Sequence, residues 1–114
     1  MHKLIILVEP PENESQFETT WPEFISLSAR LPGLRRETTS RVTHSLFGNH
    51  AYTLIHELYF DTPEIARQAL NSPLGVQAGQ TLQRITSGHV TLLLADHLED
   101  DPVRYTPPPA PAGP

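Results

Sequence analysis

The stretch most able to do chemistry is an apolar run that contains two ionisable residues. It covers residues 56–61, HELYFD, and is typical of a central β-strand that runs into a helix. Because side chains along a strand alternate between the faces of a sheet, Glu57 and Tyr59 share one face. Phe60 stands beside the helix start and is expected to face the helices, together with His56. The pattern therefore predicts Glu57 and Tyr59 on the opposite face.

Glu57 is the first predicted catalytic residue. A carboxylate enclosed in a cavity of low dielectric holds its proton more tightly, and it can act as a general acid or base. The alternative is an ion pair between Glu57 and an arginine of the neighbouring edge strand, either Arg35 or Arg41.

His44 is the second predicted catalytic residue, as a proton-transfer group. His44 and His56 share one face of the sheet if the hairpin loop between them holds an odd number of residues. Two such histidines are half of a metal site, which would need a third ligand such as His89 or Asp96. Histidines that face the core or the solvent are the alternative, and we predict no metal.

The types and positions of three residues predict contacts with a ligand, besides those of any catalytic group. Tyr59 shares the face of Glu57, and Trp21 could stack on a flat molecule at the mouth of a cavity. Trp21 could equally be the largest member of an apolar helix stripe. Arg36, next to Arg35, could hold a carboxylate or phosphate, or the pair could be a solvated sheet edge.

Composition excludes several classes of protein. A chain of 114 residues makes one domain, and a formal charge of −5 argues against nucleic acid as a partner. With no cysteine there is no disulfide framework and no thiolate metal site, so the cytoplasm is the expected location. The apolar run at residues 4–8 is too short for a signal sequence or a membrane span.

Periodicity and turn residues then set out the elements. We expect strands at residues 3–8, 34–47, 51–60 and 89–96, with helices at 15–31 and from 62, and a short, weaker helix after Pro73. The predicted caps of the first helix are Ser15 or Thr20, and Pro22 either restarts or kinks that helix. Residues 48–50 are expected to form the turn of a hairpin. Residues 100–114 are a proline-rich tail, outside a domain of residues 1–99.

This order of elements predicts an α+β protein. It is β-α-β-β-α-β, the ferredoxin-like plan, in which both helices cover one face of a four-stranded antiparallel sheet. Apolar residues occupy both faces of the first and last strands, so the uncovered face would be a large exposed apolar patch. Two such sheets packed face to face solve the problem, and we predict a homodimer that forms a dimeric α+β barrel.

The chain resembles the EthD-like family of the dimeric α+β barrel superfamily. The residues that carry the resemblance are Phe17, Trp21, the LPGL of residues 31–34, the ELYFD of residues 57–61, Ala69, Leu70, Ser72, Pro73 and Gly88. The resemblance implies the dimeric barrel, a cavity between the first helix and the open face of the sheet, and a role beside catabolic or tailoring enzymes. The family usually has a histidine four residues after the tryptophan of the first helix. Here that position is Ile25, a predicted ligand contact that cannot transfer a proton.

Three hypotheses about function follow. The first is an EthD-like protein that binds a small apolar or cyclic organic compound in the dimer cavity, with proton transfer by Glu57 or a histidine if it is an enzyme. The second is a non-catalytic binding or assembly module whose proline-rich tail docks a partner. The third is an oxidoreductase of the same superfamily, a monooxygenase that uses haem or flavin. The cofactor stays unknown.

Overall fold

The computed structural model describes residues 1–100, so the predicted tail lies outside the described residues except for Asp100. The chain forms four strands and three helices in the order β1, α1, β2, β3, α2, α3, β4. Their bounds are β1 His2–Val8, α1 Glu14–Ser28, β2 Arg36–Arg41, β3 Leu54–Phe60, α2 Pro63–Asn71, α3 Pro73–Thr86 and β4 Val90–Asp96.

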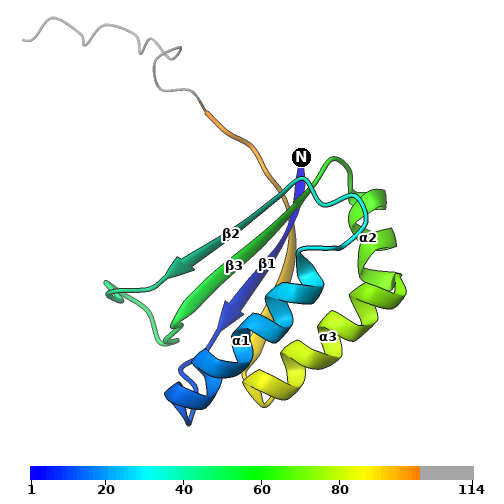
Figure 1. Ribbon diagram of the computed structural model, residues 1–114. Helices are drawn as coiled ribbons and strands as arrows, with labels where there is room; N and C mark the ends of the chain where they lie inside the picture. The colour runs from blue at the N-terminus through cyan, green and yellow to red at the C-terminus, as the bar shows by residue number, and fades with distance from the viewer. Residues whose placement is uncertain (101–114) are drawn as a thin grey trace, which may run out of the picture.

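The strands make one antiparallel sheet in the order β2-β3-β1-β4, with the helices on one side of it (Figure 1). This confirms the predicted α+β, ferredoxin-like architecture. It also confirms that β1 is an inner strand and that β2, with few apolar residues, lies at an edge. Within the described residues no helix has the length and apolarity that crossing a membrane requires.

The core lies between the sheet and the helices. β1 and β3 bury every second side chain there, because one face of each strand meets the helices. The buried strand residues are Leu4, Ile6, Val8, Leu54, His56, Leu58 and Phe60, and the helices meet them with Phe17, Trp21, Phe24, Ala66, Ala69, Ala78 and Leu82. His56 therefore lies under the helices, as its position in the strand predicts.

The predicted caps of α1, Ser15 or Thr20, were wrong. Asn13 is its N-cap, with its side-chain oxygen accepting from the amide of Gln16 at 3.0 Å, so the helix begins two turns before Thr20. The helix continues through Pro22 without restarting. A proline there leaves one carbonyl without its helical partner, and the packing of Trp21 and Phe24 against the sheet compensates.

The predicted hairpin is present, but the prediction of its turn was wrong. The β2–β3 pairing ends at Arg41 and Leu54, and residues 42–53 form a long loop in place of a tight turn at 48–50. Leu46 and Phe47 find no core to pack against, since their side chains are 95% and 100% exposed. Hairpin pairing beyond Arg41 would add strand without burying any apolar surface in this chain.

The two helices that follow β3 are joined at Ser72. Thr62 caps α2 with a 3.2 Å bond from the amide of Ile65, and Ser72 caps α3 with a 3.1 Å bond from the amide of Gly75. The segment after Pro73 was predicted to be a short, weak helix, but α3 is longer than α2. Gly75 allows the two helices to meet closely, because a Cβ there would lie 2.2 Å from the carbonyl oxygen of Ala69.

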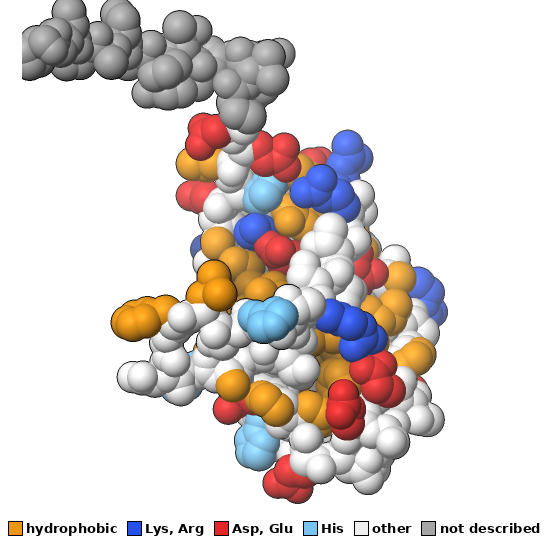
Figure 2. Space-filling model, turned by 90° about the vertical axis from the view of Figure 1, so that its left-hand side faces the viewer, with side chains coloured by type: hydrophobic (Ala, Val, Ile, Leu, Met, Phe, Trp, Pro, Cys, Tyr) orange, Lys and Arg blue, Asp and Glu red, His pale blue; other side chains and the backbone are white. Residues whose placement is uncertain are grey.

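The open face of the sheet is the one that the helices leave uncovered. Strand alternation assigns it these residues of the four strands: Arg36, Thr38, Ser40, Ile55, Glu57, Tyr59, Lys3, Ile5, Leu7, Thr91, Leu93 and Ala95. The residues of β2 are polar, the apolar residues lie mainly on β1, β3 and β4, and the charged groups gather toward one end. Figure 2 shows acidic, basic and histidine side chains interleaved with hydrophobic ones on this side of the molecule.

Candidate functional site

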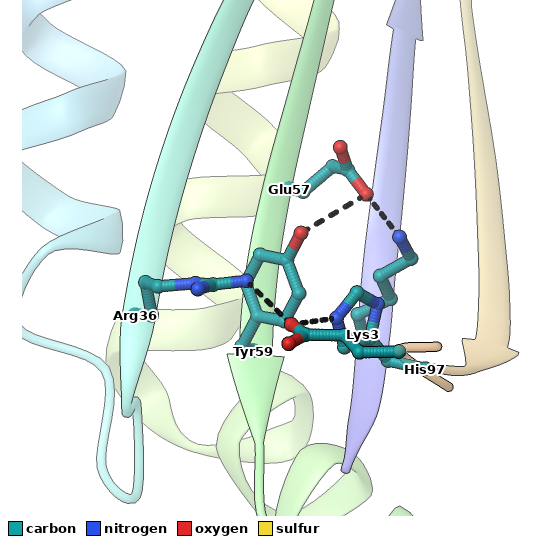
Figure 3. Close-up of polar contacts among 6 residues, drawn as sticks. Lys3, Arg36, Glu57, Tyr59 and His97 are labelled. Atoms are coloured by element: carbon teal, nitrogen blue, oxygen red, sulfur yellow. Dashed lines mark hydrogen bonds and ion pairs between the residues drawn. The ribbon is translucent and has the colours of Figure 1, made fainter. Parts of the chain in front are cut away.

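Three neighbouring strands bring the polar residues of the open face together. In the strand register Arg36 lies opposite Tyr59, and Tyr59 lies opposite Lys3. Glu57 is two residues before Tyr59 on β3 and therefore points to the same face. His97, directly after β4, completes the group (Figure 3). We call Lys3, Arg36, Glu57, Tyr59 and His97 the open-face cluster.

Glu57 is held by a lysine at the centre of this cluster. The Lys3 Nζ lies 2.5 Å from Glu57 Oε2, and the Tyr59 hydroxyl donates to the same oxygen at 3.4 Å. Both charged side chains are largely shielded, with 17% and 19% of their surface exposed. The hydrogen bond to Glu57 raises the pKa of Lys3, against the opposing effect of burial. Lys3 therefore stays protonated at neutral pH.

The partner of Glu57 differs from the predicted alternative. Arg35 contacts Asp61 at 3.4 Å, and Arg41 binds Glu18 across the sheet edge at 2.7 Å. An ion pair with a cation of a neighbouring strand does exist, but the cation comes from β1. Strand alternation predicts the face on which Glu57 lies, but it does not predict which strand is its neighbour. The order of the strands in the sheet determines that Lys3 is the partner.

Tyr59 is buried although the face around it is open, with 4% of its surface exposed. Its ring is covered by three side chains: the Arg36 guanidinium 4.2 Å from the ring centre, the Lys3 Nζ at 5.4 Å, and the His97 ring edge-on at 4.8 Å. A cation over an aromatic face is attracted by the ring quadrupole, so Arg36 is held in place there.

Glu99 contacts two residues of the open-face cluster. His97 Nε2 lies 2.7 Å from Glu99 Oε1, and the Arg36 guanidinium is 3.5 Å from the same oxygen. The bond to His97, followed by the charges of His97 and Arg36, lowers the pKa of Glu99. Sequence reasoning missed Lys3, His97 and Glu99. The adjacency of the first and third strands in this fold is the signal that could have found Lys3.

The geometry suits recognition of a polar group on an otherwise apolar molecule. A hydroxyl, a carboxylate and an ammonium converge within one small area, and half-buried Ile5, Leu7 and Ile55 continue the face beyond them. Apolar walls with a few converging polar groups are the usual composition of a small-molecule site.

Two of the predicted ligand contacts lie on the other side of the sheet. Trp21 is 7% exposed, packs between Phe17 and Phe24, and meets His56 edge-on at 5.3 Å. Ile25 packs against the same core. The structure therefore does not bring Trp21 and Ile25 together with Glu57 and Tyr59, and α1 does not border the open face as the resemblance implied. Their role as ligand contacts stays a prediction.

His44 lies in the loop between β2 and β3. It is exposed and lines a hollow of about 410 Å³ with Phe47, His50 and Tyr52. His56 faces the helices, so the two histidines do not form the predicted cross-strand pair. Within residues 1–100 no three histidine or acidic side chains gather as they would around a metal ion.

A second polar group, under α1, was also missed. His56 is fully buried, with Nε2 2.7 Å from Glu37 Oε2 and Nδ1 2.8 Å from the Thr39 hydroxyl. The Ser28 hydroxyl donates to the same Glu37 oxygen at 2.5 Å. Burial lowers the pKa of His56, and the bond to Glu37 opposes that shift. The neutral imidazole then donates to Glu37 and accepts from Thr39, so this chain of bonds is satisfied.

Comparison with known proteins finds chains similar to this one in sequence and in fold. No family model matches it. An EthD family protein from Bacillus halodurans superposes with a TM-score of 0.80 and 28% identity, over 86% of this chain and 99% of that one. An uncharacterized 11.0 kDa protein of the thcB-thcC intergenic region of Rhodococcus erythropolis is 30% identical over 99 residues, which are 84% of this chain and 94% of that protein. The chain is EthD-like in sequence and fold.

More distant solved structures share the fold alone. SnoaB from Streptomyces nogalater, a cofactor-independent oxygenase, has a TM-score of 0.67 and 16% identity, over 89% of this chain and 96% of that one. A dimeric protein of unknown function and ferredoxin-like fold from Bacteroides fragilis has a TM-score of 0.62 and 15% identity, over 84% and 95%. The resemblance read from the sequence is thus confirmed.

Proposed function

We propose that this EthD-like chain forms a homodimer through its open face and binds a small organic molecule between the two sheets. The observation that carries the proposal is the open-face cluster, in which a Lys–Glu pair and a tyrosine hydroxyl lie next to apolar residues of the same face. Charged groups at that place are costly in a purely structural interface, so a ligand that uses them is the better explanation.

The apolar remainder of the open face supports the homodimer. Ile5, Leu7 and Ile55 are only half-buried, and Leu93 at the β4 edge is 47% exposed. A continuous apolar face of this kind favours association with a complementary surface. A second copy presents the same face, and the Bacteroides fragilis neighbour with this fold is dimeric.

The chemistry of the cluster suggests a class of ligand. An apolar, cyclic body would lie along Ile5 and Ile55, with a hydroxyl or carbonyl group toward Tyr59 and Lys3. The ammonium and the tyrosine hydroxyl are donors suited to an oxygen that carries or develops negative charge. In a reaction, Glu57 would take the proton, because it is the acceptor of this cluster.

The test compares two ligands that differ by one hydroxyl. Binding of 1-naphthol and of naphthalene is measured by calorimetry for the wild type, Tyr59→Phe and the matched control Tyr52→Phe, whose tyrosine lies in the loop. We expect Tyr59→Phe to raise the dissociation constant of 1-naphthol by about tenfold, which is the effect of one lost hydrogen bond. The dissociation constant of naphthalene should stay unchanged, because naphthalene has no hydroxyl to bind. The control should bind both as the wild type does.

Two results would count against the proposal. Either the wild type is a monomer by sedimentation equilibrium at micromolar concentration, or neither compound binds with a dissociation constant below about 1 mM, the weak limit of specific recognition. Equal losses in the Tyr59 and Tyr52 variants would remove the open-face cluster from the site.

A further inference from the structure

The loop of residues 42–53 carries the most exposed apolar side chains of the described chain. Leu46 is 95% exposed and Phe47 is 100% exposed. The loop extends beyond the strand ends and away from the helices (Figure 1), and hydrophobic side chains stand clear of the body of the molecule in Figure 2. A large exposed apolar pair at a loop tip is unfavourable in water, so a partner surface is expected to cover it.

The loop is also free of formal charge. Residues 42–53 read VTHSLFGNHAYT, with no Lys, Arg, Asp or Glu, in a chain that has 8 basic and 13 acidic residues. The core of a protein–protein interface is poor in charged residues and rich in aromatic side chains, and this loop has the same composition. An anionic membrane surface is a poor alternative, because binding to it requires Lys or Arg beside the apolar groups.

The loop is continuous with the open face. Beneath it lies the hollow of about 410 Å³, whose lining includes Val42, Tyr52 and Ile55. Ile55 belongs to the open face, next to Leu7 of β1 in the strand register. The loop therefore extends the surface through which the homodimer is proposed to form.

A second exposed apolar surface lies at the opposite edge of the sheet. Leu93 lies on the open face of this edge strand and is 47% exposed, while Leu92 and Leu94 point to the opposite face of β4 and are 52% and 44% exposed. Val8 pairs with Leu54 and with Val90, so the loop and the start of β4 lie at the same end of the sheet. When two sheets face each other about an axis parallel to their strands, the β2 edge of one covers the β4 edge of the other.

We infer that the 42–53 loop is a docking arm, and that Leu46 and Phe47 of each copy pack on Leu93 at the β4 edge of the second copy. The inference rests on the proposed homodimer and specifies the contact that closes its cavity at the β4 edge. In such a dimer the loop of each copy covers the β4 edge of the other copy. The same contact therefore occurs twice, as the symmetry of an isologous interface requires.

Dimer affinity tests the arm. A double variant, Leu46→Ser with Phe47→Ser, is compared with Val76→Ser, a similar change at an exposed apolar residue of α3. Both should fold, because these side chains are exposed. We expect the arm variant to raise the dimer dissociation constant by at least about tenfold, since each dimer loses both arms, and the control to change nothing. An unchanged arm variant would overturn the inference while leaving the homodimer intact, whereas a monomeric wild type would remove the proposed function itself.

Cross-linking tests where the arm lies. The chain has no cysteine, so Phe47→Cys and Leu93→Cys each introduce a single thiol. The two variants are mixed, allowed to exchange subunits and oxidised. A disulfide-linked pair in the mixture, with little in either variant alone, is the expected result. A pair formed by Phe47→Cys alone would show arm against arm, and it would overturn the contact with β4, as would the absence of any linked pair.

Discussion

At the scale of single residues, His56 has an unusual position for an ionisable group. It is fully buried beneath Trp21 and Phe24, and its two nitrogens are bonded to Glu37 and Thr39. Burial favours the neutral form and Glu37 favours the charged one, and the net effect lowers the pKa of His56 below its ordinary 6.5. The folded state therefore binds a proton at His56 less readily than the unfolded chain does.

This difference predicts a pH dependence of stability. Above pH 6.5 His56 is neutral in the folded and the unfolded state, and its contribution to the free energy of unfolding is complete. This contribution is lost as the pH falls through the lowered pKa of His56. Urea unfolding at pH 8, 7, 6 and 5 should show the wild type losing more stability toward low pH than His56→Gln does. His50→Gln, a change in the exposed loop, is the control and should follow the wild type. Parallel curves for the wild type and His56→Gln would contradict the prediction.

The Lys3–Glu57 pair gives a second prediction at this scale. Because both side chains are largely shielded, removing one charge leaves the other partly desolvated. We expect Lys3→Met and Glu57→Gln each to lower the free energy of unfolding by roughly 1–2 kcal/mol, and the double variant to lose less than the sum. A double-mutant cycle by chemical unfolding measures the coupling. Strict additivity would mean that the pair contributes nothing.

At the scale of elements, α3 contains two glycines with opposite roles. Gly75 is buried where α2 and α3 meet, and a Cβ there would lie 2.2 Å from the Ala69 carbonyl oxygen and 2.5 Å from that of Leu70. Gly79, one turn later, is exposed, and a Cβ would meet no atom within 4 Å. One glycine is required by packing, while the other only weakens the helix.

The two glycines make a matched pair of variants. Gly79→Ala should raise the free energy of unfolding by about 0.5–1 kcal/mol, since alanine loses less backbone entropy in a helix. Gly75→Ala should lower it by roughly 1–3 kcal/mol, because α2 and α3 must separate. Thermal and urea unfolding of both variants decides the matter. A stabilising Gly75→Ala would show that the helix junction can shift without cost.

The element boundaries show where sequence patterns were insufficient. Asn13, Ser15 and Thr20 all have capping side chains, and only packing against the sheet determines that Asn13 caps α1. The strand pattern of residues 34–47 overestimated β2, because Leu46 and Phe47 have strand propensity although no core within residues 1–100 receives them. Propensity describes a residue's preference, while its neighbours decide whether that preference can be satisfied.

At the scale of the whole molecule, the architecture was predictable and the assembly of the site was not. The order of elements and the apolar character of both faces of β1 were sufficient to predict a sheet covered on one side. Alternation along β3 correctly separated Glu57 and Tyr59 from His56. It could not reveal that Lys3 and His97 approach them, or that Trp21 lies across the sheet, because those contacts depend on strand order and on which way a helix stripe faces.

The place of β1 in the sheet also affects how the chain folds as it is made. β1 lies between β3 and β4, and its second partner spans Val90–Asp96, near the far end of the described residues. On the ribosome, β1 can pair with β3 well before β4 emerges, which leaves the other edge of an apolar strand unpaired for a time. Such long-range pairing slows folding and exposes the nascent chain to misassociation. The last strand is therefore the step that commits the molecule to its native state.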